Sequence, residues 1–439
     1  MTRSRRAVLA GGAAALASLA GCSAFDRDTP EYDREKLAAL GETTLPDPPA
    51  AFPVSIPASA FERHRTRART LVERVPERPD IPNGAVAGRL RRERAEVLDE
   101  LEASPDRDEG GPLDRLGEAR NVRADAASVA AAYRAATGDI AAETVAARRD
   151  RLRRDRLGFE REWRRRGGDP ATALVVHREL EDLSREVRRG IAPERAFPPD
   201  PASAVFHVGR IVRELEAGRA ALTDAERLRA RYLDASAEPR SFATALSVGG
   251  ARLRRRIRSR ESRLHEYVGS EVDRLPFDRS IEGTALEDLY RETAASVQRH
   301  REDANRARRR GMLATALLET GIEMTAWRTL GTVVRDVRDG DLVVPSGVPE
   351  IRAAQRRAAD AVTAAWAETP TVLATALARP AYSHLRQGTG YLGGAPWSDE
   401  PVDEGDAGRV FASFVRARHY ANAVPETMAA VRDAYLSIR

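Results

Sequence analysis

Apolar residues recur along most of the chain at spacings of three and four, which is the pattern of amphipathic helices. Two helix starts are especially clear, Asp169-Pro170 and Asp200-Pro201, where a capping carboxylate precedes a proline at the first helical position. No stretch alternates convincingly between apolar and polar residues as a strand would. From residue 58 onward the pattern predicts an all-α chain of about 12 helices with no significant sheet, packed as bundles or as an elongated array.

Proline and glycine divide the chain into segments. Residues 22–57 contain several prolines that block helix formation and favour extended structure, so they are predicted to form a tether after a signal peptide at 1–21. A proline-rich stretch at 190–199 suggests a soft boundary within the helical body. We therefore expect an N-terminal helical region at 58–190 and a C-terminal helical domain at 200–439.

The predicted helix over 312–334 is apolar on nearly every side and should be central in the fold. Glu319 and Glu323 lie one turn apart on one stripe of this helix. Two buried carboxylates repel each other and are desolvated unless they are paired. They form either a cation or ligand site, or ion pairs with arginines of neighbouring helices, and the sequence leaves both interpretations open.

Residues 388–405 are predicted to form the longest loop. The run 388–393 matches the spacing Gly-x-Gly-x-x-Gly, but it follows a helical pattern rather than a strand, which excludes a dinucleotide-binding turn. Tyr391 and Trp397 lie in this glycine-rich stretch and are followed by several acidic residues. They are candidates for a binding surface, with a plain connector packed on the helices as the alternative.

Composition limits the chemistry that the chain can perform. Its 72 basic residues include a single lysine, Lys36, which lies in the predicted tether. P-loop, kinase and Schiff-base chemistry each need a lysine in the folded body. The only cysteine, Cys22, also lies outside the predicted helical body, so the body has no cysteine to act as a nucleophile or a metal ligand. The seven histidines form neither His-x-x-x-His nor Glu-x-x-His. We expect no metal and no cofactor, and no catalytic residue stands out.

The first 22 residues carry the strongest motifs. Arg5-Arg6 precedes a short apolar run, which resembles a twin-arginine export signal, and Leu19-Ala20-Gly21-Cys22 resembles a lipobox. The order of these motifs is similar to that of twin-arginine-exported prokaryotic lipoproteins, those of haloarchaea in particular. The resemblance implies cleavage before Cys22, a lipid on its sulfur, and anchoring at the outer face of the cytoplasmic membrane.

Removal of this signal leaves 69 basic and 67 acidic residues, so the mature chain is nearly neutral. Export and near-neutrality together argue against a nucleic-acid partner. We expect a membrane-anchored helical lipoprotein that is a non-catalytic scaffold or binding component, open to a protein partner. The alternative is a small-ligand or cation receptor, or an enzyme, that uses the Glu319/Glu323 helix and the 388–406 loop.

Overall fold

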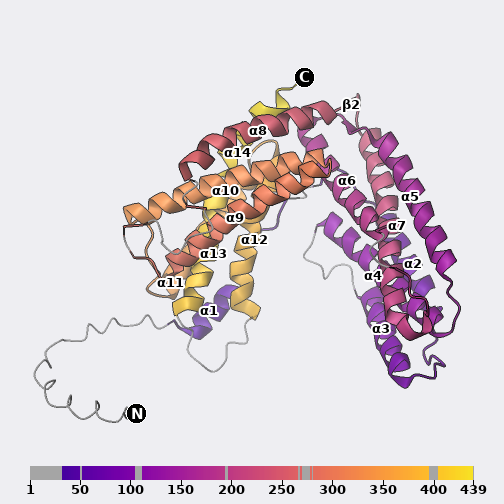
Figure 1. The fold of residues 1–439 in the computed structure, drawn as a ribbon. Helices are drawn as coiled ribbons and strands as arrows, with labels where there is room; N and C mark the ends of the chain where they lie inside the picture. Colours follow the sequence, from indigo (N-terminus) through magenta and orange to yellow (C-terminus); the bar gives the residue numbers. More distant parts are fainter. Residues whose placement is uncertain are drawn as a thin grey trace, which may run out of the picture.

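The chain folds into two helical arms that meet at an angle, as Figure 1 shows. The computed structural model describes residues 32–49, 52–103, 111–192, 196–264, 267–268, 277–278, 280–394 and 404–438. The first arm consists of α2 (Ala58–Val72), α3 (Gly84–Glu102), α4 (Pro112–Ala136), α5 (Ala142–Trp163), α6 (Pro170–Gly190) and α7 (Val205–Asp234). The second arm consists of α8 (Ala243–Leu264), α9 (Ala285–Arg309), α10 (Leu313–Asp339), α11 (Val348–Trp366), α12 (Thr371–Gly394), α13 (Glu404–Asn422) and α14 (Val424–Val431).

The all-α prediction is confirmed over the described residues. The sheet consists of two short antiparallel strands, β1 (Arg166–Gly167) and β2 (Arg240–Ser241), with Arg166 opposite Ser241. These strands connect segments next to the joint between the arms. In the described part of the chain, no helix is both long enough and apolar enough to span a membrane.

Carboxylates begin helices where the sequence predicted them. Asp169 accepts a hydrogen bond from the backbone N–H of Thr172 at 2.7 Å, and α6 starts directly after it. Asp200 accepts one from the N–H of Ala202 at 3.1 Å and starts a short 3-10 turn (Ala202–Ala204) that leads into α7. Local capping thus sets the start of α6, whereas α7 begins at Val205 after the 3-10 turn and has no side-chain cap of its own.

Helix α10 is buried on nearly every side, as its apolar sequence predicted. Trp327 and Leu330 are fully buried, and Met324 and Ile322 are almost so. The helix packs against α8, α9, α12, α13 and α14 in its own arm and against α6 of the first arm. It therefore forms the core of the second arm and also contributes, with α12, to the contact with the first arm.

The joint between the arms is polar and buried. Glu181 of α6 is 1% exposed and accepts hydrogen bonds from the N–H groups of Ala314 and Thr315 at 3.2 and 2.8 Å. Arg165 donates to the Glu181 carboxylate at 3.1 Å and to the carbonyl of Gly311 at 2.8 Å. The N-cap residue of α10 has no capping side chain, so a carboxylate from the other arm satisfies the first N–H groups of α10.

Much of the predicted tether is part of the folded body. Residues 32–49 and 52–57, which we call the N-terminal strap, are packed against both arms. Within the strap, α1 (Arg34–Gly41) lies on α12 at the end of the second arm that is remote from the joint (Figure 1). Farther along, the buried Val54 lies beside α7 of the first arm. The prolines make this segment extended without making it a free spacer.

Hydrogen bonds and a close approach hold α1 in place. The Tyr32 hydroxyl donates to the carbonyl of Pro345 at 2.6 Å, and the Gln355 side chain donates to the carbonyl of Leu40 at 3.0 Å. A Cβ at Gly41 would lie only 2.5 Å from the backbone nitrogen of Gly393 on α12. The contact therefore requires a residue without a side chain at position 41.

The division between the arms falls after α7, and not at 190–200 as the proline-rich stretch had suggested. Helix α7 packs against α4 and α6. Glycines permit this packing, because a Cβ at Gly190 would lie 2.6 Å from the carbonyl oxygen of Glu214 and 3.2 Å from the Cα of Gly218. The stretch at 190–200 is a connection between two helices of one arm.

The glycine-rich run 388–393 is helical rather than part of a loop, because α12 continues to Gly394. At Gly388, a Cβ would lie 2.7 Å from the ring Cε1 of Phe414 on α13. This glycine therefore serves close helix packing and not a turn. Only the later part of the predicted loop, 395–403, lies outside the described residues.

Candidate functional site

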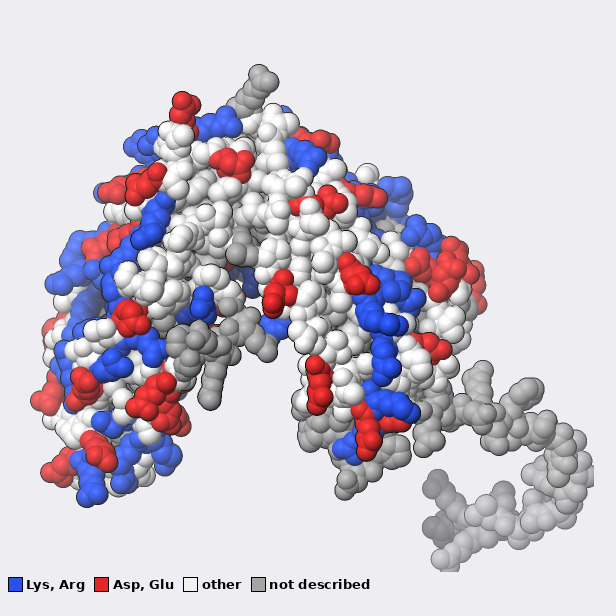
Figure 2. Space-filling model, turned by 180° about the vertical axis from the view of Figure 1, so that it is seen from behind, with Lys and Arg blue, Asp and Glu red and all other residues white. Residues whose placement is uncertain are grey.

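A cleft of about 680 Å³ lies at the joint, between α6 and the segment from the end of α9 to the start of α10. Figure 2 shows the hollow between the arms and the mixture of acidic and basic side chains over their surfaces. Six guanidinium groups and three carboxylates line the cleft, which is an excess of three positive charges. The charged lining residues are Arg178, Asp182, Arg185, Arg188, Arg189, Asp303, Arg306, Arg310 and Glu319.

Two of the carboxylates already have arginine partners. Asp182 lies 2.9 Å from the guanidinium of Arg185 and 3.5 Å from that of Arg178. Asp303 lies 3.2 Å from the guanidinium of Arg306. These ion pairs cancel much of the charge on three of the six arginines.

The other three arginines, Arg188, Arg189 and Arg310, have no carboxylate partner among the described residues. Arg188 is half-buried, whereas Arg189 and Arg310 are exposed. Burial lowers the pKa of Arg188, and the nearby carboxylates of Glu160 and Glu181 oppose this shift. The guanidinium groups of Arg156 and Arg310 act in the same direction as burial. Arginine nevertheless stays protonated in proteins, so the cleft keeps these positive charges.

Glu319, which the sequence analysis singled out, also lines the cleft. Its Oε2 lies 3.3 Å from Nδ1 of His300, and both side chains are 17% exposed. With Asp303 they form a cluster in which one potential ligand atom from each residue lies within 4.8 Å of the others. An imidazole and two carboxylates are suitable ligands for a divalent transition metal or zinc.

Glu323 has a different environment from Glu319. It is 5% exposed and lies 3.5 Å from the guanidinium of Arg301, which also pairs with Glu261 at 2.9 Å. Burial raises the pKa of Glu323, and Arg301 opposes that rise. Each of the two interpretations left open by the sequence thus fits one of the two residues. Glu323 forms an ion pair with an arginine, whereas Glu319 belongs to a histidine–carboxylate cluster at the cleft.

The two aromatic candidates do not contribute to this cleft in the described structure. Tyr391 lies near the end of α12, is 48% exposed, and does not line the cleft. Trp397 lies outside the described residues. Tyr391 and Glu319 therefore do not line the same cleft.

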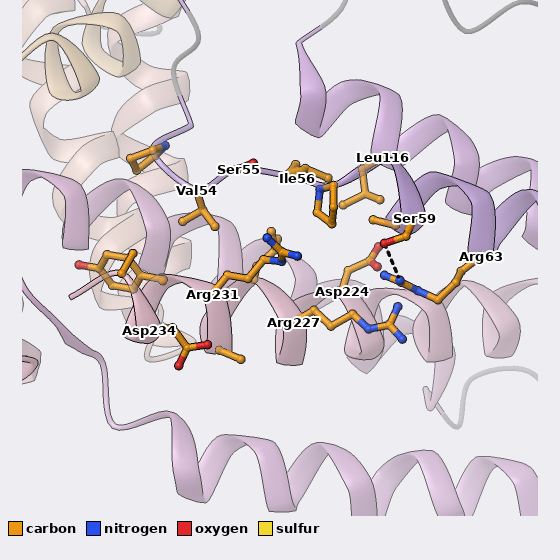
Figure 3. Close-up of a pocket in the computed structure, with 17 residues that line it drawn as sticks. Val54, Ser55, Ile56, Ser59, Arg63, Leu116, Asp224, Arg227, Arg231 and Asp234 are labelled. Atoms are coloured by element: carbon orange, nitrogen blue, oxygen red, sulfur yellow. Dashed lines mark hydrogen bonds between the residues drawn. The ribbon is translucent and has the colours of Figure 1, made fainter. Parts of the chain in front are cut away.

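A second groove, of about 870 Å³, runs between the N-terminal strap and α7 (Figure 3). Val54, Ser55 and Ile56 of the strap lie on one side, and Arg227 and Arg231 of α7 lie on the other. Its charged lining residues are Arg63, Asp224, Arg227, Arg231 and Asp234. The three positive and two negative charges nearly balance, so the groove attracts anions less strongly than the cleft at the joint does.

A buried polar cluster in the first arm escaped the sequence analysis. Nε2 of His64 lies 3.1 Å from Asp224, and Nδ1 lies 3.4 Å from a guanidinium nitrogen of Arg123. Because a guanidinium only donates, Nδ1 accepts, and the proton on Nε2 is donated to Asp224. Both ring nitrogens are engaged, which fits a structural role. His64 and Asp224 are 160 residues apart, so no local pattern joins them.

Comparison with known families divides the chain at the same place as the structure. Residues 59–238 match a family described as a domain of unknown function (DUF8262), and residues 239–433 match another described in the same words (DUF8264). No curated protein and no solved structure matches the chain. The α6 wall of the cleft lies in the first matched region, and the α9–α10 wall lies in the second.

Proposed function

We propose that the protein is an exported lipoprotein that acts as a two-armed, non-catalytic binding component, with its ligand held in the cleft at the joint. The observation that carries this proposal is the shared construction of the cleft by the two matched regions. Ligand sites occur preferentially between domains, where binding also favours one relative arrangement of them. A charged, part-buried cleft at the joint suits that role.

Export and anchoring rest on the N-terminal motifs. In the native host, we expect the wild-type protein in the membrane fraction and a Cys22→Ser variant in the soluble extracytoplasmic fraction. Replacing both Arg5 and Arg6 by lysine should leave unprocessed chain inside the cell. Retention of Met1 in the mature wild-type protein, or unchanged membrane attachment of Cys22→Ser, would disprove the anchoring.

Binding in the cleft is tested by native mass spectrometry of protein purified from its own host under mild conditions. Wild-type protein should carry a small molecule that is absent from an Ala192→Trp variant, whose added indole fills the cleft next to α6. Circular dichroism establishes that the variant is folded. The same ligand on a folded Ala192→Trp protein would place the binding site elsewhere.

The His300–Asp303–Glu319 cluster favours a second candidate function, a cation receptor. Mn²⁺ titrated into the protein and followed by electron paramagnetic resonance should then bind at one site. Glu319→Gln should weaken binding at least about tenfold, as loss of a metal-site residue commonly does. Glu323→Gln is the matched control, because Glu323 is paired with Arg301 and lies outside the cluster. Equal effects of the two substitutions would argue against this function.

A further inference from the structure

We infer that the ligand of the cleft is a small phosphate-bearing oxyanion with two or more negative charges. This inference deepens the proposed function and rests on it. The walls of the cleft carry a net positive charge, because six guanidinium groups face three carboxylates. The whole chain, in contrast, has 72 basic and 67 acidic residues. The excess in the cleft is therefore a local feature and does not follow from composition.

Pairing within the protein does not use up this excess. Asp182 and Asp303 pair with arginines of the cleft, and Glu319 pairs with His300. Within the described residues, no carboxylate forms an ion pair with Arg188, Arg189 or Arg310, although those of Glu160 and Glu181 lie close enough to Arg188 to affect its pKa. Phosphate oxygens match the fixed fork of guanidinium donors, and such bonds are about twice as strong as neutral ones.

Helix termini explain part of the arginine cluster but not all of it. Helix α6 ends at Gly190 and α9 ends at Arg309, and both ends adjoin the cleft. The C-terminus of a helix carries roughly half a negative charge, so two termini offset about one of the three excess positive charges. About two positive charges remain for a ligand, which is why a dianion or a larger anion fits better than a monoanion.

The size and position of the walls favour a ligand larger than a single ion. The volume of about 680 Å³ lies within the usual range for small-molecule sites, roughly 300–1,000 Å³. Arg188 and Arg189 lie on the first arm, and Arg310 lies at the end of α9 in the second. A pyrophosphate group or an organic phosphate can contact both walls and relieve the repulsion between Arg188 and Arg310.

The test uses pyrophosphate as the probe and the full mature chain carrying Cys22→Ser, which avoids the need for detergent. Isothermal titration calorimetry at low salt should show one site for pyrophosphate, and rising salt should weaken it. The double variant Arg188→Gln/Arg310→Gln should bind at least about tenfold more weakly, since two charge-assisted contacts are lost. The matched control Arg309→Gln removes one charge from an exposed neighbour that does not line the cleft, and should bind like wild type.

A second variant tests the same inference in the opposite direction. Asp182→Asn removes a carboxylate from the cleft and releases Arg178 and Arg185, so pyrophosphate should bind several-fold more tightly. Partial unfolding cannot imitate a gain in affinity. The inference is overturned if wild type fails to bind pyrophosphate at millimolar concentration, or if the double variant and Asp182→Asn both bind like wild type. Neither result depends on whether Cys22 carries a lipid.

The phosphate group has two possible sources, a free solute or a lipid head group. Sedimentation of the same Cys22→Ser chain with phosphatidylglycerol vesicles separates them, with phosphatidylcholine vesicles as the control. We expect no co-sedimentation that depends on Arg188 and Arg310, because a cleft at the joint suits a solute. Co-sedimentation that is lost in the double variant and displaced by pyrophosphate would overturn the assignment to a small solute and identify a lipid head group instead.

Discussion

At the scale of single residues, Glu181 matters most to the arrangement of the arms. Its carboxylate is buried, caps the N-terminus of α10 from the other arm, and accepts a hydrogen bond from the Arg165 guanidinium. Removing a partner from a buried charged network is costly, because the remaining charge is left without compensation. The same carboxylate adjoins the proposed ligand site, since Thr315 both donates to it and lines the cleft.

Replacing Glu181 by glutamine should therefore destabilise the protein by about 3 kcal/mol, since Arg165 loses its buried partner and the amide cannot accept at both positions. Urea unfolding followed by circular dichroism measures the change. Glu302→Gln, on the exposed face of α9, serves as the control and should change stability by less than about 0.5 kcal/mol. A loss below about 1 kcal/mol for Glu181→Gln would show that the cap contributes little to the joint.

Buried His177 makes stability depend on pH. Burial, reinforced by the Arg165 guanidinium, lowers the pKa of His177 to about 3. The Trp163 indole N–H also donates to its Nδ1 at 3.1 Å, which requires the neutral ring. The unfolded chain has a histidine pKa near 6.5, so it binds a proton that the folded chain does not. The stabilising effect is complete above about pH 6.5 and is lost as the pH falls toward 3.

We expect His177→Gln to remove about 1.4 kcal/mol per pH unit from the slope of stability against pH below about 6. Urea unfolding of both proteins between pH 7.5 and 4 gives the two slopes. His384 and His419 keep a similar dependence in the variant, because burial also lowers the pKa of each to about 3. Parallel slopes for wild type and His177→Gln would show that His177 gains a proton in the folded state as readily as in the unfolded state.

At the scale of helices and their contacts, glycines allow pairs of helices to pack more closely than a side chain would permit. Gly190 ends α6 where it crosses α7, and a Cβ there would approach the Glu214 carbonyl oxygen to 2.6 Å. Gly158 is an exposed glycine within α5, and a Cβ there would meet no atom within 4 Å. The same substitution should thus have opposite effects at the two positions.

Gly158→Ala should stabilise the protein by about 0.5–1 kcal/mol, because alanine loses less backbone entropy in a helix. Gly190→Ala should destabilise it by about 1–3 kcal/mol, because the added methyl group pushes the α6 and α7 backbones apart. Thermal unfolding gives the shift in Tm for each variant. If both variants were stabilised, the close crossing of α6 and α7 would be wrong.

Periodicity was sufficient to predict most helices, including the central helix over 312–334 and the start of α6 at Asp169. It was not sufficient at 388–393, because whether glycines end a helix or admit a neighbour depends on Phe414, which is distant in sequence. The packing of the N-terminal strap against the folded body could not be predicted for the same reason. The strap's prolines indicate extended backbone, but contacts with residues distant in sequence, such as Pro345 and Gln355 of the second arm, determine that it packs against the folded body.

The candidate site shows the same limit. Glu319 and Glu323 were recognised because carboxylates are unusual in an apolar helix. Their different partners, His300 and Arg301, both come from α9 and could not be assigned from sequence. The arginine-rich cleft was missed altogether, because its walls come from helices that are more than 100 residues apart and each wall alone resembles an ordinary solvated helix face.

At the scale of the whole molecule, the strap relates the fold to the proposed lipid anchor. Tyr32 is held at Pro345, and α1 lies on the second arm far from the joint (Figure 1). Nine residues lie between Cys22 and Tyr32, and an extended chain of ten residue-to-residue steps spans at most about 35 Å. If Cys22 is lipidated, this end of the second arm must stay near the membrane, and the joint with α8 can lie farther from it.

The sole lysine makes this orientation measurable. Lys36 lies on α1 with 66% of its side chain exposed, so an amine-reactive donor dye labels one known position in the body of the protein. In vesicles that contain an acceptor-labelled lipid, energy transfer from Lys36 should be strong. In the variant Lys36→Arg/Arg255→Lys, the only lysine moves to an exposed site on α8, and energy transfer should fall. Lys36→Arg alone corrects for dye on the N-terminal amine. Transfer from position 255 that equals or exceeds transfer from position 36 would mean that the two-armed molecule lies flat or inverted on the membrane. In that case, α1 does not set its orientation.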